Sequence, residues 1–133
     1  MPFVRISLFS PTIDQQQIRS LQQGTTELMA SVMRKEVAGI AVLVEHIERC
    51  GWSIAGLPTD VGAHVEATIG KGTNTADEKA RFMSGMWRLL RSELGAELRE
   101  PTYIVVHEID PNAYGRGGLT RAERDRRRQA ADV

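Results

Sequence analysis

The sequence has few of the features that mark several large classes of protein. Its 133 residues include a single cysteine, Cys50, so no disulfide can form within the chain, and we expect an incidental thiol in a reducing compartment. No apolar run approaches the roughly 20 residues of a membrane span. The N-terminus also lacks the basic segment and long apolar stretch of a signal peptide. We therefore expect a cytoplasmic protein without a membrane partner.

The chain also lacks an excess of charge of either sign. Lys and Arg number 17, and so do Asp and Glu, which gives a formal net charge of zero. This balance gives no general reason to expect a nucleic-acid partner. The C-terminal tail at 120–133 is rich in arginine, but interspersed acidic residues favour a solvated helix or a contact at an oligomer edge. A nucleic-acid-binding arm is the less favoured alternative for this tail.

No motif for a metal or a cofactor stands out. The spacing of the histidines and acidic residues does not suggest metal ligands, and "GKGTNT" at 70–75 lacks the spacing of a phosphate-binding loop. We expect no cofactor and no metal.

The sequence predicts the same order of secondary-structure elements, strand–helix–strand, in each of its halves. Residues 3–9 alternate with a period of two, which predicts a strand. Residues 13–34 follow a T-x-x-Q capping box at Thr12 and carry apolar residues at helical spacing, which predicts an amphipathic helix. The β-branched run at 38–47 is typical of a strand buried on both faces. The second half predicts a strand at 64–70, a helix at about 76–95 after a capping box at Thr75, and a strand at 102–109.

The repeat is also visible residue by residue. The segment "GWSIAGLP" at 51–58 aligns with "AYGRGGLT" at 113–120, which places Trp52 over Tyr114. We therefore predict two tandem βαβ units, 1–61 and 62–119, followed by the tail. A unit of this size cannot bury enough surface alone. We expect an α+β fold in which the units share a four-stranded sheet, with both helices on one face and an oligomer covering the other.

The first strand begins in an unusual way, with "MPFVRISLF". Proline is tolerated at the start of a strand because it has no N–H to donate, and a purely structural role is one interpretation. The alternative requires only that Met1 be removed, because Pro2 would then carry a free secondary amine.

These residues together resemble a known family. The N-terminal "MPFVRISL", the capped helix, the β-branched strand and the closing aromatic-Gly-x-Gly-Gly turn resemble the tautomerase superfamily. The likeness is to the 4-oxalocrotonate tautomerase group, of which this chain resembles a fused, tandem form over about residues 1–120. The resemblance implies a tautomerase/MIF-like fold, removal of Met1, and a homotrimer of fused chains. It also implies an isomerase in which Pro2 is the general base for keto-enol proton transfer on a small 2-hydroxydienoate or enol-pyruvate acid.

The expected role suits the chemistry of the N-terminal amine. An α-amino group titrates near 7.7–8.0, and apolar surroundings lower its pKa. A base with a pKa near neutrality is suited to abstracting a proton beside a carbonyl. The second unit aligns near Ala63 and cannot have a free amine, so we expect one proline site per chain.

The substrate clamp departs from the family's pattern. Thr12, Ala41, Thr73 and Tyr103 occupy the positions where the resemblance would place arginines. Their absence disfavours a dicarboxylate dienol and leaves a monocarboxylate, such as an arylenolpyruvate, as the favoured substrate.

Two other cations are expected to bind the substrate carboxylate. Arg116 is suited to a bidentate contact and Lys71 to a point-charge contact. Tyr114, Tyr103 and Trp52 are the aromatic candidates for substrate binding, each weighed against a structural role. For Trp52 packing is the favoured role, because it should face the half-site that has no amine.

Two alternative functions stay open. The same proline is compatible with a dehalogenase or decarboxylase of a small three-carbon acid. The related dehalogenase branch has a water-activating carboxylate near the position of Arg116, so this residue counts against dehalogenation. The other alternative is a binding or assembly module with only residual activity.

Overall fold

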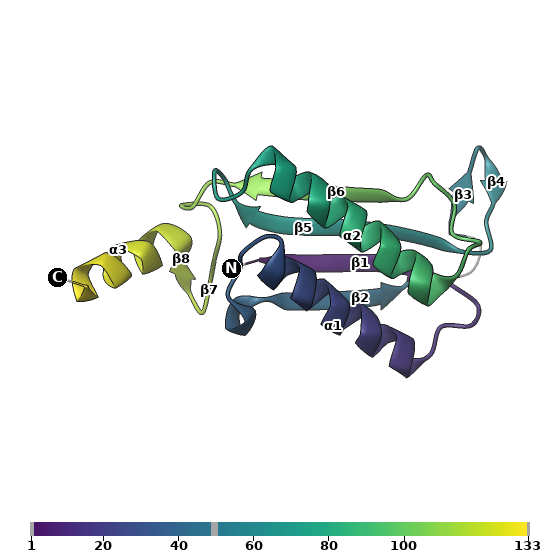
Figure 1. Ribbon diagram of the computed structural model, residues 1–133, viewed down its shortest axis with the longest axis horizontal. Coiled ribbons are helices and arrows are strands. Elements are labelled where there is room, and N and C mark those ends of the chain that lie inside the picture. The colour runs from purple at the N-terminus through teal and green to yellow at the C-terminus, as the bar shows by residue number, and fades with distance from the viewer. Residues whose placement is uncertain (1, 49–50, 133) are drawn as a thin grey trace.

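A four-stranded mixed sheet lies at the centre of the chain, and two long helices cover one of its faces (Figure 1). The structure is a computed structural model that describes residues 2–48 and 51–132. Met1 and Cys50, on which two of the sequence expectations depend, lie outside the described residues. The strands, in their order across the sheet, are β2 (Ala41–His46), β1 (Phe3–Phe9), β5 (Gly62–Gly70) and β6 (Tyr103–Ile109), and the helices are α1 (Gln15–Ser31) and α2 (Ala76–Leu94).

The strand pairing confirms the tandem βαβ arrangement. Within each half the two strands run parallel, β1 with β2 and β5 with β6, and each pair is joined through its helix. The halves meet through the antiparallel pair β1 and β5, in which Phe3 lies opposite Thr68 and Phe9 opposite Gly62. Because of this antiparallel contact, the start of β1 and the end of β5 lie at the same end of the sheet.

Two short hairpins and a third helix complete the fold. The hairpin β3 (Ser53–Ile54) with β4 (Leu57–Pro58) lies at one end of the sheet, and the hairpin β7 (Gly115–Arg116) with β8 (Leu119–Thr120) lies at the other (Figure 1). The second hairpin leads directly into α3 (Arg121–Ala131), which extends beyond the end of the sheet where β1 begins. A short 3₁₀ helix, η1 (Val37–Gly39), connects α1 to β2.

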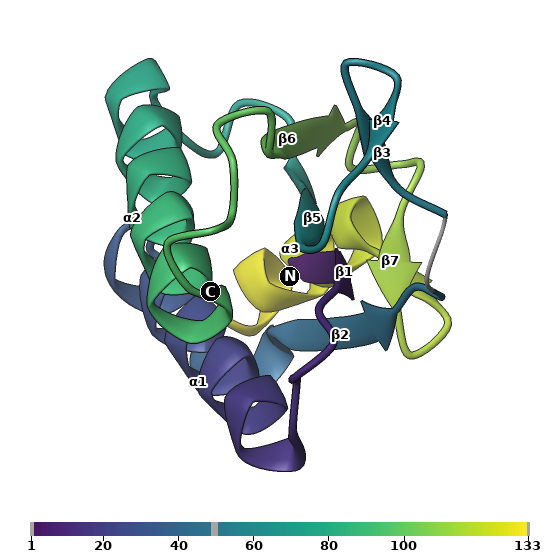
Figure 2. The same cartoon turned by 90° about the vertical axis from the view of Figure 1, so that its right-hand side faces the viewer.

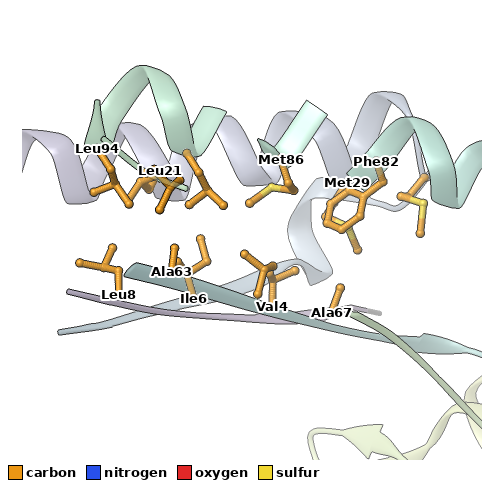
Figure 3. Packing of buried hydrophobic residues seen from close by; sticks show 14 of the residues in the cluster. Val4, Ile6, Leu8, Leu21, Met29, Ala63, Ala67, Phe82, Met86 and Leu94 are labelled. Atoms are coloured by element: carbon orange, nitrogen blue, oxygen red, sulfur yellow. The ribbon is translucent and has the colours of Figure 1, made fainter. Parts of the chain in front are cut away.

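The core lies between the sheet and the two long helices. Val4, Ile6 and Leu8 point from β1 toward Leu21 and Met29 of α1 and toward Phe82, Met86 and Leu94 of α2 (Figure 3). Burying each large apolar side chain contributes about 1.5–3 kcal/mol. Both halves of the chain contribute to this one cluster, so the start of β1 is anchored by the packing of both units.

The first helix begins later than the sequence predicts. Asp14, not Thr12, is its N-cap: the Asp14 carboxylate accepts from the Gln17 backbone N–H at 2.8 Å, and the Gln17 side chain accepts from the Asp14 N–H at 2.8 Å. Asp is a stronger N-cap than Thr, which explains the shift of two residues. The capping box predicted at Thr75, with Glu78, is present.

The prediction of a strand buried on both faces at 38–47 is wrong for the isolated chain. The segment supplies η1 and then β2, which lies at the edge of the sheet and alternates between exposed and half-buried residues. The face without helices carries Phe3 and Leu43, each 40% exposed, and Tyr103, 69% exposed. Figure 2 shows α1 and α2 side by side on the opposite face. The β-branched composition of β2 therefore suits a face that a further chain would cover.

The helices of the described segments include none with the length and apolar character needed to cross a membrane.

Candidate functional site

Pro2 lies at a crowded end of the sheet. It is buried, and its carbonyl accepts a hydrogen bond from the Ala41 backbone N–H at 3.2 Å. The Phe3–Thr68 pairing places the turn after Gly70 at this same end, and the Lys71 N–H donates to the Ile109 carbonyl at 2.9 Å. The start of β1 therefore lies at the same end of the sheet as the ends of β5 and β6.

A cavity of about 280 Å³ opens at this end, between the segment after α1 and the hairpin and helix at the C-terminus. We call it the cationic cavity, because its lining is dominated by positive charge. Its two acidic lining residues are Glu36 and Asp125. Pro2 is not itself a lining residue. The cationic lining residues are Arg34, Lys35, Arg116, Arg121, Arg124 and Arg128.

Lys35 joins one wall of the cationic cavity to the end of β5. Its Nζ donates to the Thr73 hydroxyl at 2.9 Å, and that hydroxyl donates to the Gly70 carbonyl at 2.6 Å. Partial burial, together with the positive charges of Arg121 and Arg34, lowers the pKa of Lys35 from its usual 10.5 to about 8. An anion bound in the cavity would therefore stabilise the charged form of Lys35.

Arg34, on the same wall, is already neutralised. Its Nε donates to the Glu78 carboxylate at 2.5 Å, and its Nη2 donates to the Thr73 carbonyl at 3.2 Å. Hydrogen bonds from Arg34 and from the Thr75 backbone N–H lower the pKa of Glu78 to about 2. This ion pair fastens the end of α1 to the start of α2, which is a structural role.

The opposite wall comes from the C-terminal hairpin and α3. Arg121 donates through Nε to Asp125 at 3.0 Å and through Nη1 to the Tyr114 hydroxyl at 3.4 Å. Arg124 donates through Nη2 to the Arg116 carbonyl at 3.0 Å. The Nε atoms of Arg116 and Arg124 are buried and have no hydrogen-bond partner among the described residues. Two donors beneath this wall are therefore left unsatisfied.

The expected substrate-binding residues do not all come together. Arg116 lines the cationic cavity and Tyr114 lies behind it, hydrogen-bonded to Arg121. Lys71 is exposed in the turn after β5 and does not line the cavity. Tyr103 begins β6 opposite His64, at the end of the sheet away from Pro2. Within one chain, Arg116, Tyr114 and Lys71 lie at the Pro2 end of the sheet, and of these three Arg116 lines the cavity.

The two aligned aromatic residues occupy equivalent places at opposite ends of β5. A Cβ on Gly62 would lie 2.6 Å from the Trp52 ring, and a Cβ on Gly70 would lie 2.7 Å from the Tyr114 hydroxyl. Each aromatic residue therefore packs on a glycine that leaves room for it. Trp52 packs on Gly62, at the start of the second unit, where the chain has no free amine.

Sequence reasoning missed most of the cavity's cations. Lys35 follows the predicted helix in the short stretch "MRKEV" and carried no recognised signal. Arg121, Arg124 and Arg128 were assigned to a solvated tail, although their spacing at i, i+3 and i+7 places them on one helical face. The spacing was the available signal, but the sequence alone does not show what that face contacts.

No group of three or more metal-ligating side chains occurs in the described ranges 2–48 and 51–132.

Comparison with known families identifies the class of protein. Residues 2–61 match the family model described as "Tautomerase enzyme", and the match begins at Pro2. The search of curated proteins found no significant match. The first βαβ unit therefore matches the tautomerase family model, and nearly the whole chain shares its fold with solved structures that include fused 4-OT proteins.

Solved structures with this fold match nearly the full chain. Pt0534 inactivated by 2-oxo-3-pentynoate superposes with a TM-score of 0.81 at 13% identity, covering 92% of this chain and 98% of that one. The W0 fused 4-OT symmetric trimer superposes at 0.78 with 17% identity, covering 90% and 98%. N1, of the cis-3-chloroacrylic acid dehalogenase family, superposes at 0.71 with 15% identity, covering 97% and 99%. The chain therefore has the tandem architecture of the fused 4-OT structure.

Proposed function

We propose that this protein is a tautomerase that uses the amine of Pro2 as a general base on a small enol acid. The observation that carries the proposal is that the family match begins at Pro2, which is buried at the end of the sheet that carries the cationic cavity. Removal of Met1 is required, because only then is the amine free.

The environment favours an amine that is neutral near pH 7. Burial disfavours the charged form, and positive charges in the neighbouring cavity disfavour it further. The neutral amine takes the proton of the substrate's enol hydroxyl, and the resulting ammonium returns a proton to the carbon, which gives the keto acid. Proton transfer of this kind needs no external oxidant or reductant.

Arg116 is the cation that best fits the role of binding the substrate carboxylate. Arg116 lines the cavity, whereas Lys71 is exposed in the turn after β5 and does not line it. We therefore propose Lys35 in place of Lys71 as the second cation. Tyr114 supports this wall through Arg121, and no direct substrate contact is needed for it.

We further propose that the chain works as a homotrimer. The fused 4-OT structures with this fold are trimers, and this chain leaves apolar residues exposed on the face without helices. Trp52 and Tyr103 lie at the end remote from Pro2 in their own chain. In an assembly they are available to a site formed with a neighbouring chain.

The test compares wild-type protein with Pro2→Ala on phenylenolpyruvate, a monocarboxylate, and 2-hydroxymuconate, a dicarboxylate. General base catalysis contributes typically 10²–10⁴-fold, so we expect kcat/KM to fall by about 10²-fold or more in Pro2→Ala. Pro101→Ala, in an exposed segment before β6, is the matched control and should retain activity.

Other outcomes discriminate the alternatives. Equal rates for wild type and Pro2→Ala would reject the proposal and favour a binding module. Chloride release from 3-chloroacrylate, or carbon dioxide release from malonate semialdehyde, in the absence of tautomerase activity would assign the same proline to a dehalogenase or a decarboxylase.

A further inference from the structure

We propose that the side-chain amine of Lys35 is a site of reversible modification by carbon dioxide, which it binds covalently as a carbamate. Lys35 lies in the short segment after α1 and lines the cationic cavity. The modification needs only this amine and dissolved carbon dioxide, so it does not require Pro2 to be a catalytic base.

The reaction joins the neutral amine to one molecule of carbon dioxide. The lone pair of Nζ attacks the carbon atom and forms a C–N bond, the electron pair of one C=O bond moves onto its oxygen, and one N–H proton passes to water. One amine and one carbon dioxide thus give one carbamate anion and one proton, with no oxidant or reductant. A protonated amine has no lone pair to donate, so the reaction requires a lysine that is partly neutral.

The surroundings of Lys35 meet this requirement. Its side chain is half-buried and experiences the positive charges of Arg121 and Arg34, which lower its pKa to about 8. About one amine in ten is then neutral at pH 7, against about one in 3,000 for a lysine with the usual pKa of 10.5. The amine is also held in position, because Nζ donates to the Thr73 hydroxyl at 2.9 Å.

The two other lysines of the chain are placed differently. Lys71 is exposed in the turn after β5 and does not line the cavity. Lys79 donates from Nζ to the Glu108 carboxylate at 2.7 Å, so its amine is already engaged with an acid. We therefore expect the modification at Lys35 and use the other two lysines as internal controls.

The arginines beside Lys35 also stabilise the product. Arg121 and Arg34 each use two of their three guanidinium nitrogens in hydrogen bonds. Within the part of the chain that the structure describes, Arg121 Nη2 and Arg34 Nη1 make no hydrogen bond, and the two side chains are 25% and 63% exposed. Guanidinium N–H groups form strong hydrogen bonds to carboxylate oxygens, and the oxygens of a carbamate are of the same kind.

Modification also reduces the repulsion between like charges in the cavity. Six cationic and two acidic residues line it, which is an excess of four positive charges. Conversion of the Lys35 ammonium to a carbamate replaces a positive charge with a negative one and lowers this excess to two. The carbamate nitrogen keeps one N–H, so the hydrogen bond to Thr73 is retained.

Under the proposed function, the modification regulates substrate binding. Lys35 is there a cation for the substrate carboxylate, and its carbamate is an anion that repels this carboxylate. This consequence rests on the proposed function. We expect the KM for phenylenolpyruvate to rise severalfold when bicarbonate replaces chloride at equal ionic strength, with kcat little changed, and Lys35→Arg should lose this sensitivity.

The experiment is nuclear magnetic resonance of the full chain labelled with ¹⁵N-lysine, in ¹³C-bicarbonate buffer near pH 8, close to the pKa of Lys35. A carbamate on a lysine gives a ¹³C signal that the attached ¹⁵N splits into a doublet, whereas a carbamate on the unlabelled N-terminal amine gives a singlet. We expect one doublet. It should be lost in Lys35→Arg and retained in the matched controls Lys71→Arg and Lys79→Arg.

A second pair of variants keeps the test decisive if Lys35→Arg misfolds. Arg121→Gln removes a charge that favours the neutral amine and an N–H group that binds the carbamate, so the doublet should weaken severalfold. Arg127→Gln should leave it unchanged, because Arg127 donates to Glu123 at 3.1 Å and does not line the cavity. Circular dichroism and thermal unfolding of each variant check the fold.

The absence of a doublet in the wild-type protein would overturn the inference. A doublet that persists in Lys35→Arg, or one that is lost in Lys71→Arg, would also overturn it. Pro2→Ala should retain the doublet whatever its activity. A doublet without any effect of bicarbonate on KM would support the modification and remove Lys35 from the proposed substrate-binding role, so failure of this inference and failure of the proposed function are distinguishable.

Discussion

Lys35 should make the folded protein less stable at neutral pH than it is at high pH. Its pKa is lowered from 10.5 to about 8 in the folded chain, first by burial and then by the charges of Arg121 and Arg34. Between these two values the unfolded chain binds more protons than the folded chain, so stability rises with pH. The destabilisation is complete below about pH 8 and disappears as the pH rises through 10.5.

The magnitude follows from the shift and the exposure of the side chain. A pKa lowered from 10.5 to about 8 corresponds to roughly 3 kcal/mol at 1.36 kcal/mol for each tenfold change in proton affinity. Because Lys35 is only half-buried, screening by solvent reduces this figure to about 1–2 kcal/mol.

The perturbation is Lys35→Met, which keeps the length of the side chain and removes its charge. The assay is urea unfolding of both proteins at pH 7 and at pH 10.5 in chloride buffer, so that no polyvalent anion masks the effect. Between pH 7 and pH 10.5, the free energy of unfolding of the wild-type protein should rise by about 1–2 kcal/mol more than that of Lys35→Met. Titrations shared by both proteins cancel in this comparison.

A difference between the two proteins that is independent of pH would refute the reasoning. So would a wild-type protein that loses stability relative to Lys35→Met as the pH rises. The charged groups that face Lys35 in the cavity are Arg34, Glu36, Glu78, Arg116, Arg121, Arg124, Asp125 and Arg128.

Three further predictions concern the supports of the site. Gly70→Ala places a Cβ 2.7 Å from the Tyr114 hydroxyl and should cost about 1–3 kcal/mol by overpacking; an unchanged urea midpoint would contradict this. The pKa of Glu78 is lowered to about 2, so its contribution to stability is present above about pH 4.5 and is lost as the pH falls toward 2; Glu78→Gln should flatten the acid limb of the stability profile, and an unchanged limb would count against the Arg34 pair. Light scattering should give about 44 kDa, three times the 14.8 kDa of the chain, and Leu43→Asp on the open face should yield monomers; a trimer that survives this change would place the interface elsewhere.

The fold could be predicted well from the sequence because its signals are local and repeated. Alternation in 3–9, helical spacing behind capping residues, and the alignment of Trp52 with Tyr114 each predict one feature of a tandem βαβ chain. The prediction was wrong where the burial of a segment depends on its position in the sheet, which its local composition does not specify. The run at 38–47 has the composition of a buried strand, yet in a single chain β2 is an edge strand.

The candidate site could be predicted only in part. Pro2 carries a sequence signal of its own, and Arg116 was found through its distance from Tyr114. Sequence reasoning missed Lys35 and the three arginines of α3 that line the cavity. These residues come together only because the C-terminal hairpin and α3 lie against the segment after α1. A contact between segments about 80 residues apart leaves no periodicity in the sequence.

The central claim is that Pro2 carries a free amine with a pKa near neutrality. The direct measurement is a pH titration of the full chain labelled with ¹⁵N-proline, followed by nuclear magnetic resonance, after intact mass has shown whether Met1 is absent. The account predicts one titrating proline nitrogen, with a pKa at or below the 7.7–8.0 of an ordinary α-amino group. A proline amine that titrates above about 9, or no titrating proline nitrogen because Met1 is retained, would contradict it.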